Sequence, residues 1–342
     1  MIRGILFVIV FSHVLLPAVY GNGYDDYPPD LVWSPVEDVL VAALEDRLVI
    51  WTPYEGPVTV MEGEAASPAF TPDGEWVAFI LDGTIRYFQV DNPQSCRRIP
   101  HADERVACTF DPMGHPRAPA LCFTTRLLGS DIYAMGLFSD DVLVLLPENS
   151  EVRVNAPVIS PDGDNIACVN FAMNPTWYEE LYIIGDSAPL GMRARADTTF
   201  YNWSEWHESN PVWITSKVLI FQIGGWGEWE LRFLNIESGI EKLFMGNAHQ
   251  VCSALDGRLL AFCRKDPFPE SDFGLSWEDP TTVWIMDRES DYLTQASLPG
   301  EWATRPAISY DADYLAWIEI TRDGEVLKVG VGRNFWSLPE CK

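Results

Sequence analysis

Aromatic side chains are the residues best suited to recognition, and many of them lie in the second half of the chain, with acidic residues among them. Aromatic rings among carboxylates suit sugars, cationic groups or the anchor residues of a protein partner. We predict ligand-binding positions at Trp177, Tyr178, Tyr201, Trp203, Trp206, His207, Trp226, Trp229, Trp277 and Trp302. The segment 265–280 adds the acidic residues Asp266, Glu270, Asp272, Glu278 and Asp279. The alternative is that these rings bury one another as local packing.

Motifs for catalysis are poorly represented. The stretch 274–278 reads GLSWE and lacks the second glycine of a serine-hydrolase elbow. The chain has no P-loop, HExxH or dinucleotide-binding glycine pattern. Three histidines, His101, His207 and His249, would form a metal centre only if they converged around an open position, and their spacing matches no metal motif. We therefore predict no catalytic residue, no metal and no cofactor.

A repeated sequence unit must position these side chains. Residues 67–80 read SPAFTPDGEWVAFI, and residues 156–169 read APVISPDGDNIACV. Related stretches lie at 31–44, 210–221, 250–263 and 305–318, with a looser copy at 106–123. Each joins two short apolar runs through a turn, which is typical of an antiparallel hairpin. Units that recur about every 40 residues or more and are rich in strands indicate the blades of a propeller.

The turn inside the unit has a physical explanation. In the two clearest copies the turn residues are Pro72, Asp73 and Gly74, and Pro161, Asp162 and Gly163. Proline presets φ at the second position of a tight turn, aspartate can bond to nearby backbone, and glycine accepts a positive φ. The runs on either side then pair as the two inner strands of a blade. We predict a structural role for these six residues.

The pattern SPDG followed by an apolar strand resembles the WD40-like (PD40) repeats of TolB-type propellers. This resemblance implies an all-β propeller of about seven four-stranded blades, with six blades as the alternative. We expect blades to start near residues 31, 67, 105, 156, 210, 249 and 305, within one domain spanning 22–342. In such a fold the aromatic positions and the three histidines fall on the face opposite the inner hairpin turns. We expect Trp177, Tyr178, Trp226 and Trp229 in loops that follow the second strand of a blade, and 201–207 and Trp302 in loops between blades. TolB itself has a separate N-terminal α/β domain, whereas here the first repeat begins about ten residues after the predicted cleavage site, so we expect a departure from TolB at this end.

The N-terminus indicates where the protein is located, and the net charge limits the kinds of partner that we expect. A basic start, an apolar run from Ile5 to Leu16 and a small residue at Gly21 describe a signal peptide over residues 1–21. We therefore expect a periplasmic or extracellular protein with no membrane span after cleavage. The net charge of −27 disfavours nucleic-acid partners. The sequence leaves the oligomeric state open.

The seven cysteines are an odd number, so at least one must be unpaired within the chain. Two pairs, Cys108 with Cys122 and Cys252 with Cys263, straddle inner hairpins and leave open whether either forms a cross-link. Buried thiols that act as small apolar groups are the default expectation.

The leading functional hypothesis is an exported, non-catalytic TolB-like propeller that binds or scaffolds a protein, peptide or glycan in the cell envelope. We call the predicted ligand-binding positions, together with the acidic residues around them in blades 4 to 6, the aromatic rim. The alternative is a carbohydrate-active lyase or hydrolase that uses carboxylates of this rim.

Overall fold

The structure is a computed structural model. It describes residues 30–99, 105–110, 120–125, 132–136, 142–144, 153–173, 177–185, 192–193, 207–225, 228–254, 256–265, 281–298 and 300–332. Every regular element in these residues is a β-strand. No helix in this part of the chain has the length and apolarity needed to cross a membrane.

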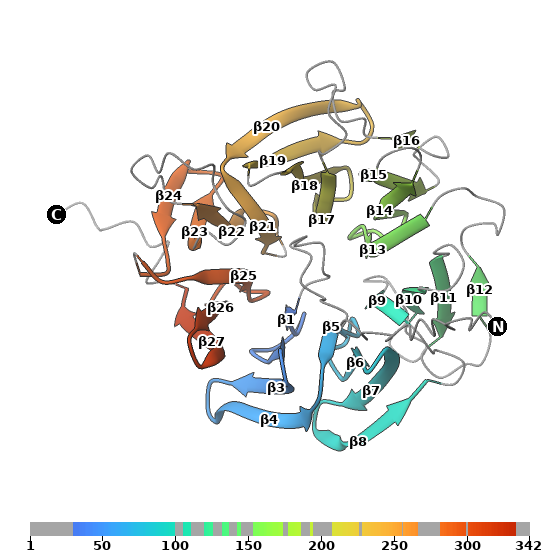
Figure 1. Ribbon diagram of the computed structural model, residues 1–342, viewed down its shortest axis with the longest axis vertical. Coiled ribbons are helices and arrows are strands. Elements are labelled where there is room, and N and C mark those ends of the chain that lie inside the picture. Colours follow the sequence, from blue (N-terminus) through green and yellow to red (C-terminus); the bar gives the residue numbers. More distant parts are fainter. Residues whose placement is uncertain are drawn as a thin grey trace, which may run out of the picture.

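The strands form consecutive sheets that follow one another around a common centre (Figure 1). The first sheet contains β1 (Leu31–Trp33), β2 (Leu40–Leu44), β3 (Arg47–Thr52) and β4 (Gly56–Glu62). The second contains β5 (Ala65–Phe70), β6 (Trp76–Leu81), β7 (Thr84–Gln89) and β8 (Asn92–Arg98). The third contains β9 (Arg105–Phe110), β10 (Ala120–Thr125), β11 (Ile132–Gly136) and β12 (Val142–Val144).

The second half of the chain continues this arrangement. One eight-stranded sheet contains β13 (Arg153–Ile159), β14 (Asn165–Met173), β15 (Trp177–Gly185), β16 (Met192–Arg193), β17 (His207–Thr215), β18 (Val218–Gly225), β19 (Glu228–Asn235) and β20 (Ile240–Gly246). The next sheet contains β21 (Ala248–Ser253), β22 (Leu259–Lys265), β23 (Thr281–Asp287) and β24 (Tyr292–Gln295). The last sheet contains β25 (Ala303–Ile308), β26 (Tyr314–Thr321) and β27 (Gly324–Val331).

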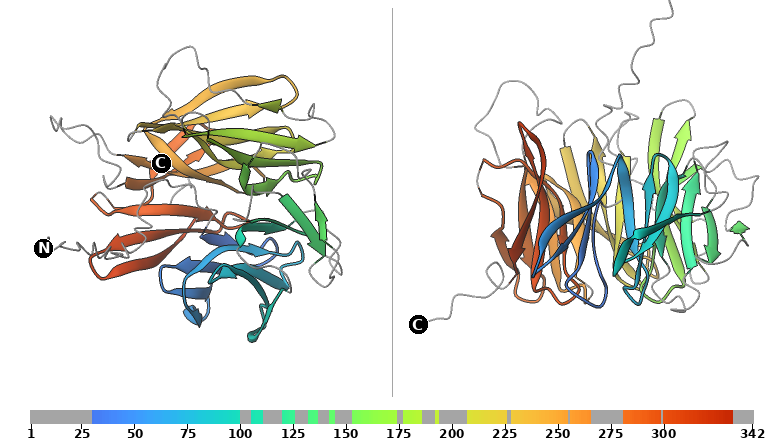
Figure 2. Two further views of the ribbon diagram at one scale, coloured as in Figure 1. Left: turned by 45° about the vertical axis from the view of Figure 1, so that its right-hand side comes forward. Right: turned by 90° about the horizontal axis from the view of Figure 1, so that it is seen from below.

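Neighbouring strands within each sheet pair antiparallel, which confirms the predicted hairpins. The exception is a parallel bridge between β15 and β17, where Glu179 lies opposite His207. This bridge joins two sheets that are otherwise separate. Seen from the side, the strands stand between two faces of a flat ring (Figure 2, right). The architecture is that of a β-propeller.

The predicted turns are built around a hydroxyl and a carboxylate. Thr71 Oγ1 donates to Asp73 Oδ1 at 2.5 Å and accepts from the Trp76 N–H at 3.0 Å. Asp73 Oδ1 also accepts from the Glu75 N–H at 3.0 Å, as the sequence predicts. Ser160 with Asp162, and Ser309 with Asp311, form the same hydroxyl–carboxylate bond at 2.6 and 2.9 Å. The turn is therefore a repeated, fully bonded unit.

At two of the inner turns, glycine also allows close contact between sheets. Gly74 has φ +73°, and a Cβ there would lie 2.5 Å from Val36 Cγ2 of the first sheet. Gly257 has φ +67°, and a Cβ there would lie 2.5 Å from the backbone oxygen of Ile214. These two inner turns thus pack directly against the preceding sheet.

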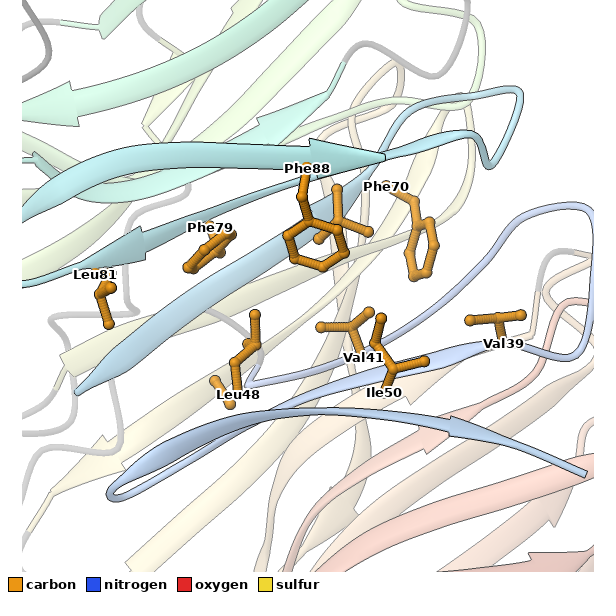
Figure 3. Close-up of a cluster of buried hydrophobic side chains, with 10 residues drawn as sticks. Val39, Val41, Leu48, Ile50, Phe70, Phe79, Leu81 and Phe88 are labelled. Carbon is orange, nitrogen blue, oxygen red and sulfur yellow. The ribbon is translucent and has the colours of Figure 1, made fainter. Parts of the chain in front are cut away.

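The core consists of apolar layers between facing sheets. Figure 3 shows Val39, Val41, Leu48 and Ile50 of the first sheet facing Phe70, Phe79, Leu81 and Phe88 of the second. Alternate residues of each inner strand face opposite neighbours, so a strand buried on both sides reads as a continuous apolar run. For example, β2 has the sequence LVAAL and all of its residues are buried.

The innermost strand of five sheets or sheet halves carries a β-bulge near its start. The register shifts between Ala66 and Ala69, Asn155 and Val158, Ser209 and Val212, His249 and Cys252, and Thr304 and Ala307. Four residues in these bulges have positive φ without being glycine: Ser67 (52°), Asn210 (48°), Gln250 (50°) and Arg305 (54°). This conformation costs a non-glycine residue about 1 kcal/mol or more, so other contacts must hold it.

Gln250 shows how a bulge is held. Its side-chain oxygen accepts from Thr304 Oγ1 at 2.5 Å and from the Arg305 N–H at 3.0 Å, both on β25 of the next sheet. Its own N–H donates to Gln222 Oε1 at 3.0 Å on β18 of the preceding sheet. The bulge therefore turns one residue toward both neighbouring sheets and links three sheets through hydrogen bonds.

The first and last sheets meet through contacts that repeat an internal junction. Trp33 on β1 donates its indole N–H to the Ala307 carbonyl on β25 at 3.0 Å. Trp213 on β17 donates in the same way to the Val158 carbonyl on β13 at 3.0 Å. Arg305 Nη1 adds an ion pair to Asp30 at 3.1 Å. In the described residues, side chains rather than paired strands join the two ends of the chain.

Replacement of Gly257 by alanine tests the contact between turn and sheet. Gly257→Ala places a Cβ against the Ile214 backbone, whereas Gly56→Ala has a similar φ of +70° and no atom within 4 Å. We expect Gly56→Ala to lower the free energy of unfolding by about 1 kcal/mol, and Gly257→Ala by about 2 kcal/mol more because of the overlap. Urea unfolding measures both. Equal losses in the two variants would show that only backbone strain matters.

The Asp30 carboxyl makes this junction sensitive to pH. Burial raises the pKa of Asp30 to about 6; Arg305 opposes this shift, and Glu325 adds to it. Because the folded-state pKa exceeds the unfolded value, the stabilising contribution of protonated Asp30 is present below about pH 4 and is lost as pH rises through 6.

Asp30→Asn should remove this pH dependence. The stability of the wild type relative to the variant should fall as pH rises from about 4 to 7, by up to about 3 kcal/mol. Urea unfolding across that range measures the difference, and the exposed Asp46→Asn controls for the loss of one carboxylate. A difference between the wild type and Asp30→Asn that does not change with pH would contradict the assignment.

Candidate binding surface

The predicted aromatic positions are only partly within the described residues. Tyr201, Trp203, Trp206, Trp226 and Trp277 lie outside them. The backbones of Trp177, Tyr178 and His207 are described, but their side chains are not. Trp229 and Trp302 have described side chains, which are 8% and 38% exposed. The joint binding site therefore stays a prediction, and among these ten positions only Trp302 has a described, exposed side chain.

Three connections are shorter than the sequence suggested. Trp177 and Tyr178, expected in a loop, are the first residues of β15 and pair with Met173 and Ala172. Trp229 lies in β19 opposite Gly224, and His207 begins β17. The expected loop positions were wrong because strand pairing extends close to the hairpin tips. The sequence there does not alternate between apolar and polar residues, so it does not show where the strands end.

Trp302 belongs to a turn that holds two large apolar side chains in water. Leu298 is 66% exposed, and Trp302 follows it after one turn. The Leu298 N–H donates to Glu301 Oε2 at 2.9 Å, and the Glu301 N–H donates to the Leu298 carbonyl at 3.2 Å. The Trp302 carbonyl accepts from the Ile320 N–H at 2.8 Å. The described residues of the 298–302 turn, Leu298 and 300–302, are thus held at both ends by hydrogen bonds, on the face where β26 ends.

The histidines give no described metal centre. His249 is buried, with 5% of its surface exposed. His101 lies outside the described residues, as does the side chain of His207. Within the described part of the chain, no group of three or more His, Cys, Asp or Glu side chains is arranged to hold a metal ion.

Four cysteines, Cys96, Cys168, Cys252 and Cys263, have described side chains. Cys252 lies opposite Ala261 and Cys263 lies opposite His249, so this hairpin has no cross-link. Burial raises the pKa of the Cys252 thiol to about 12 and that of Cys168 further, as expected for thiols that pack as apolar groups. The side chains of Cys108 and Cys122 lie outside the described residues.

Comparison with known proteins supports the fold. No family model matches the chain, and no curated protein does. An oligogalacturonate lyase in complex with manganese matches with 10% identity and a TM-score of 0.61, over 92% of this chain and 90% of that one. A puromycin-hydrolysing peptidase of Mycobacterium tuberculosis matches with 14% identity and a TM-score of 0.60, over 91% of this chain and 53% of that one.

TolB from Acinetobacter baumannii also matches, with 17% identity over 90% of this chain and 63% of that one, but its TM-score of 0.47 is too low to carry an argument. At all of these identities the likeness concerns the fold alone. The class of protein is therefore a β-propeller of the architecture shared with the lyase, and neither the binding nor the lyase hypothesis is decided by the likeness.

Proposed function

We propose that the chain is an exported, non-catalytic, TolB-like propeller of seven blades that binds a protein, peptide or glycan at the aromatic rim. The observation that carries this proposal is the 298–302 turn, which presents Leu298 and Trp302 to solvent in a fixed conformation. Isolated exposed apolar residues are common on protein surfaces. A tryptophan and a leucine on one bonded turn form a more specific feature, suited to recognition.

Pre-organisation is the reason why this turn suits binding. Each flexible side chain or loop that becomes ordered on binding costs about 0.5–1.5 kcal/mol. The hydrogen bonds of Glu301 and Ile320 already fix the backbone on both sides of the turn. The backbone is therefore ordered when the chain folds, and binding does not have to order it again. Tryptophan is also the residue most often found as an energetic anchor in interfaces.

The seven blades of this proposal rest on a count of the described innermost strands. Such strands begin at Leu31, Ala65, Arg105, Arg153, His207, Ala248 and Ala303. The eight-stranded sheet counts as two blades because only the Glu179–His207 bridge connects its halves. The repeated bulge near the start of the innermost strand supports this division, since both β13 and β17 carry it.

A matched pair of variants tests the proposal. Trp302→Ala removes the anchor, whereas Leu243→Ala removes a side chain that is 59% exposed on the outer strand β20. We expect a glycan and peptide array probed with the labelled full chain to give signals that Trp302→Ala reduces at least about tenfold and Leu243→Ala leaves unchanged. Array signals that Trp302→Ala does not alter, or an array without signals, would contradict the rim as the binding surface.

A further inference from the structure

The last sheet differs from the other sheets at its outer edge. Within the described residues it has three strands in the order β25-β26-β27, whereas the first, second and third sheets have four each. Among the described strands, β27 pairs only with β26. No residue of β27 is fully buried, although the third strands β3 and β7 each contain buried residues. The outer backbone edge of β27 is therefore open in the described part of the chain.

A cavity lies where a fourth strand would pack. It has a volume of about 320 Å³ and lies between β27 and the first sheet. Its lining includes Leu44, Val49, Pro57, Thr59, Val326 and Leu327. At other junctions the fourth strand fills this space: β4 contributes Val60 and Met61 to the core shared with the second sheet, and β20 contributes Phe244 and Met245 to the next.

The Gly324 end of the cavity is strongly acidic. A second hollow of about 530 Å³ shares Arg47 and Glu325 with the first, so the two form one groove. Its lining carries the carboxylates of Glu45, Asp46, Glu64, Asp323 and Glu325. The one cation in this lining, Arg47, is paired with Asp46 at 3.0 Å, and Glu325 is paired with Arg305 at 2.9 Å, so the acidic end is defined mainly by Glu45, Glu64 and Asp323. Such a concentration of carboxylates favours a positively charged partner group.

We propose that this groove binds an extended peptide of a partner protein as a fourth strand on β27. Main-chain hydrogen bonds to the open edge would supply affinity, and pockets for alternate side chains would supply specificity. The neighbouring third and fourth strands of this chain, such as β3 with β4 and β7 with β8, pair antiparallel. The peptide therefore runs antiparallel to β27, with its C-terminal end at Gly324.

The register of β27 defines the peptide sequence. Leu327 and Val329 pack on the core shared with the first sheet, and residues directly opposite each other in a sheet share a face. Peptide residues opposite Leu327 and Val329 are therefore apolar and fill the cavity. The peptide residue opposite Glu325 is a lysine or arginine, which lies near Glu64 and Asp323 in the acidic end of the groove.

The test uses the full chain and a fluorescein-labelled peptide, VTVTLTKT, measured by fluorescence anisotropy. Its eight residues match the length of β27, with the lysine opposite Glu325. We expect saturable binding, and at least about tenfold weaker binding of VTVTLTET because glutamate meets the acidic end. Asp323→Asn should weaken binding of the lysine peptide, with no change in melting temperature.

Two tryptophan variants on β4 locate the peptide. Thr59 lines the cavity, so Thr59→Trp should fill it and abolish binding. Val58 is 45% exposed and lies next to Thr59 in the strand, with its side chain on the opposite face. Val58→Trp should therefore leave binding intact, as should Trp302→Ala, which alters only the rim.

The proposal is overturned if the full chain does not bind the peptide. This includes the cases in which another segment of the chain, or a second copy of the chain, occupies the groove instead. It is also overturned if Thr59→Trp and Val58→Trp bind equally, or if the glutamate peptide binds as tightly as the lysine peptide.

Discussion

Adjacent sheets of this protein depend on side chains that cross from one innermost strand to the next. Trp33 and Trp213 each donate an indole N–H to the backbone of the preceding innermost strand, and Gln250 bonds to strands on both sides. The Trp33 bond is buried and the others are partly buried; a buried polar group without a partner costs about 1–3 kcal/mol. Since the apolar layers between sheets have no direction, these bonds set the relative position of neighbouring sheets.

The same constraint explains the strained backbone near the centre. A bulge residue with positive φ turns its side chain toward the next sheet, and the cross-sheet bonds of Gln250 and Arg305 offset the strain. Because the centre and the inner turns are tied in this way, the outer connections and outer edges are available for recognition. Both proposed surfaces lie in these regions: the 298–302 turn is an outer connection, and the groove beside β27 lies at an outer edge.

Local sequence patterns predict the hairpins well but not the junctions. The PDG turns, the continuous apolar inner strands and outer strands such as Tyr292–Gln295 can be read from the sequence because their causes lie within a few residues. The bond from Trp33 to Ala307 and the open edge of β27 cannot, because they depend on residues far apart in the chain. The sequence does not predict the packing of Gly257 against Ile214 for the same reason. A glycine after aspartate in a turn does favour the positive φ that Gly257 adopts.

The most direct test of this account compares Trp33→Phe with Trp213→Phe. Both tryptophans are nearly buried, at 7% and 9% exposure, and each makes one 3.0 Å bond across a junction. If the first and last sheets meet as the internal sheets do, urea unfolding will show similar losses of about 1 kcal/mol or more in both variants. If Trp213→Phe lowers the free energy of unfolding by about this amount and Trp33→Phe does not lower it, the first and last sheets are not joined by the Trp33 bond. That result would contradict the account.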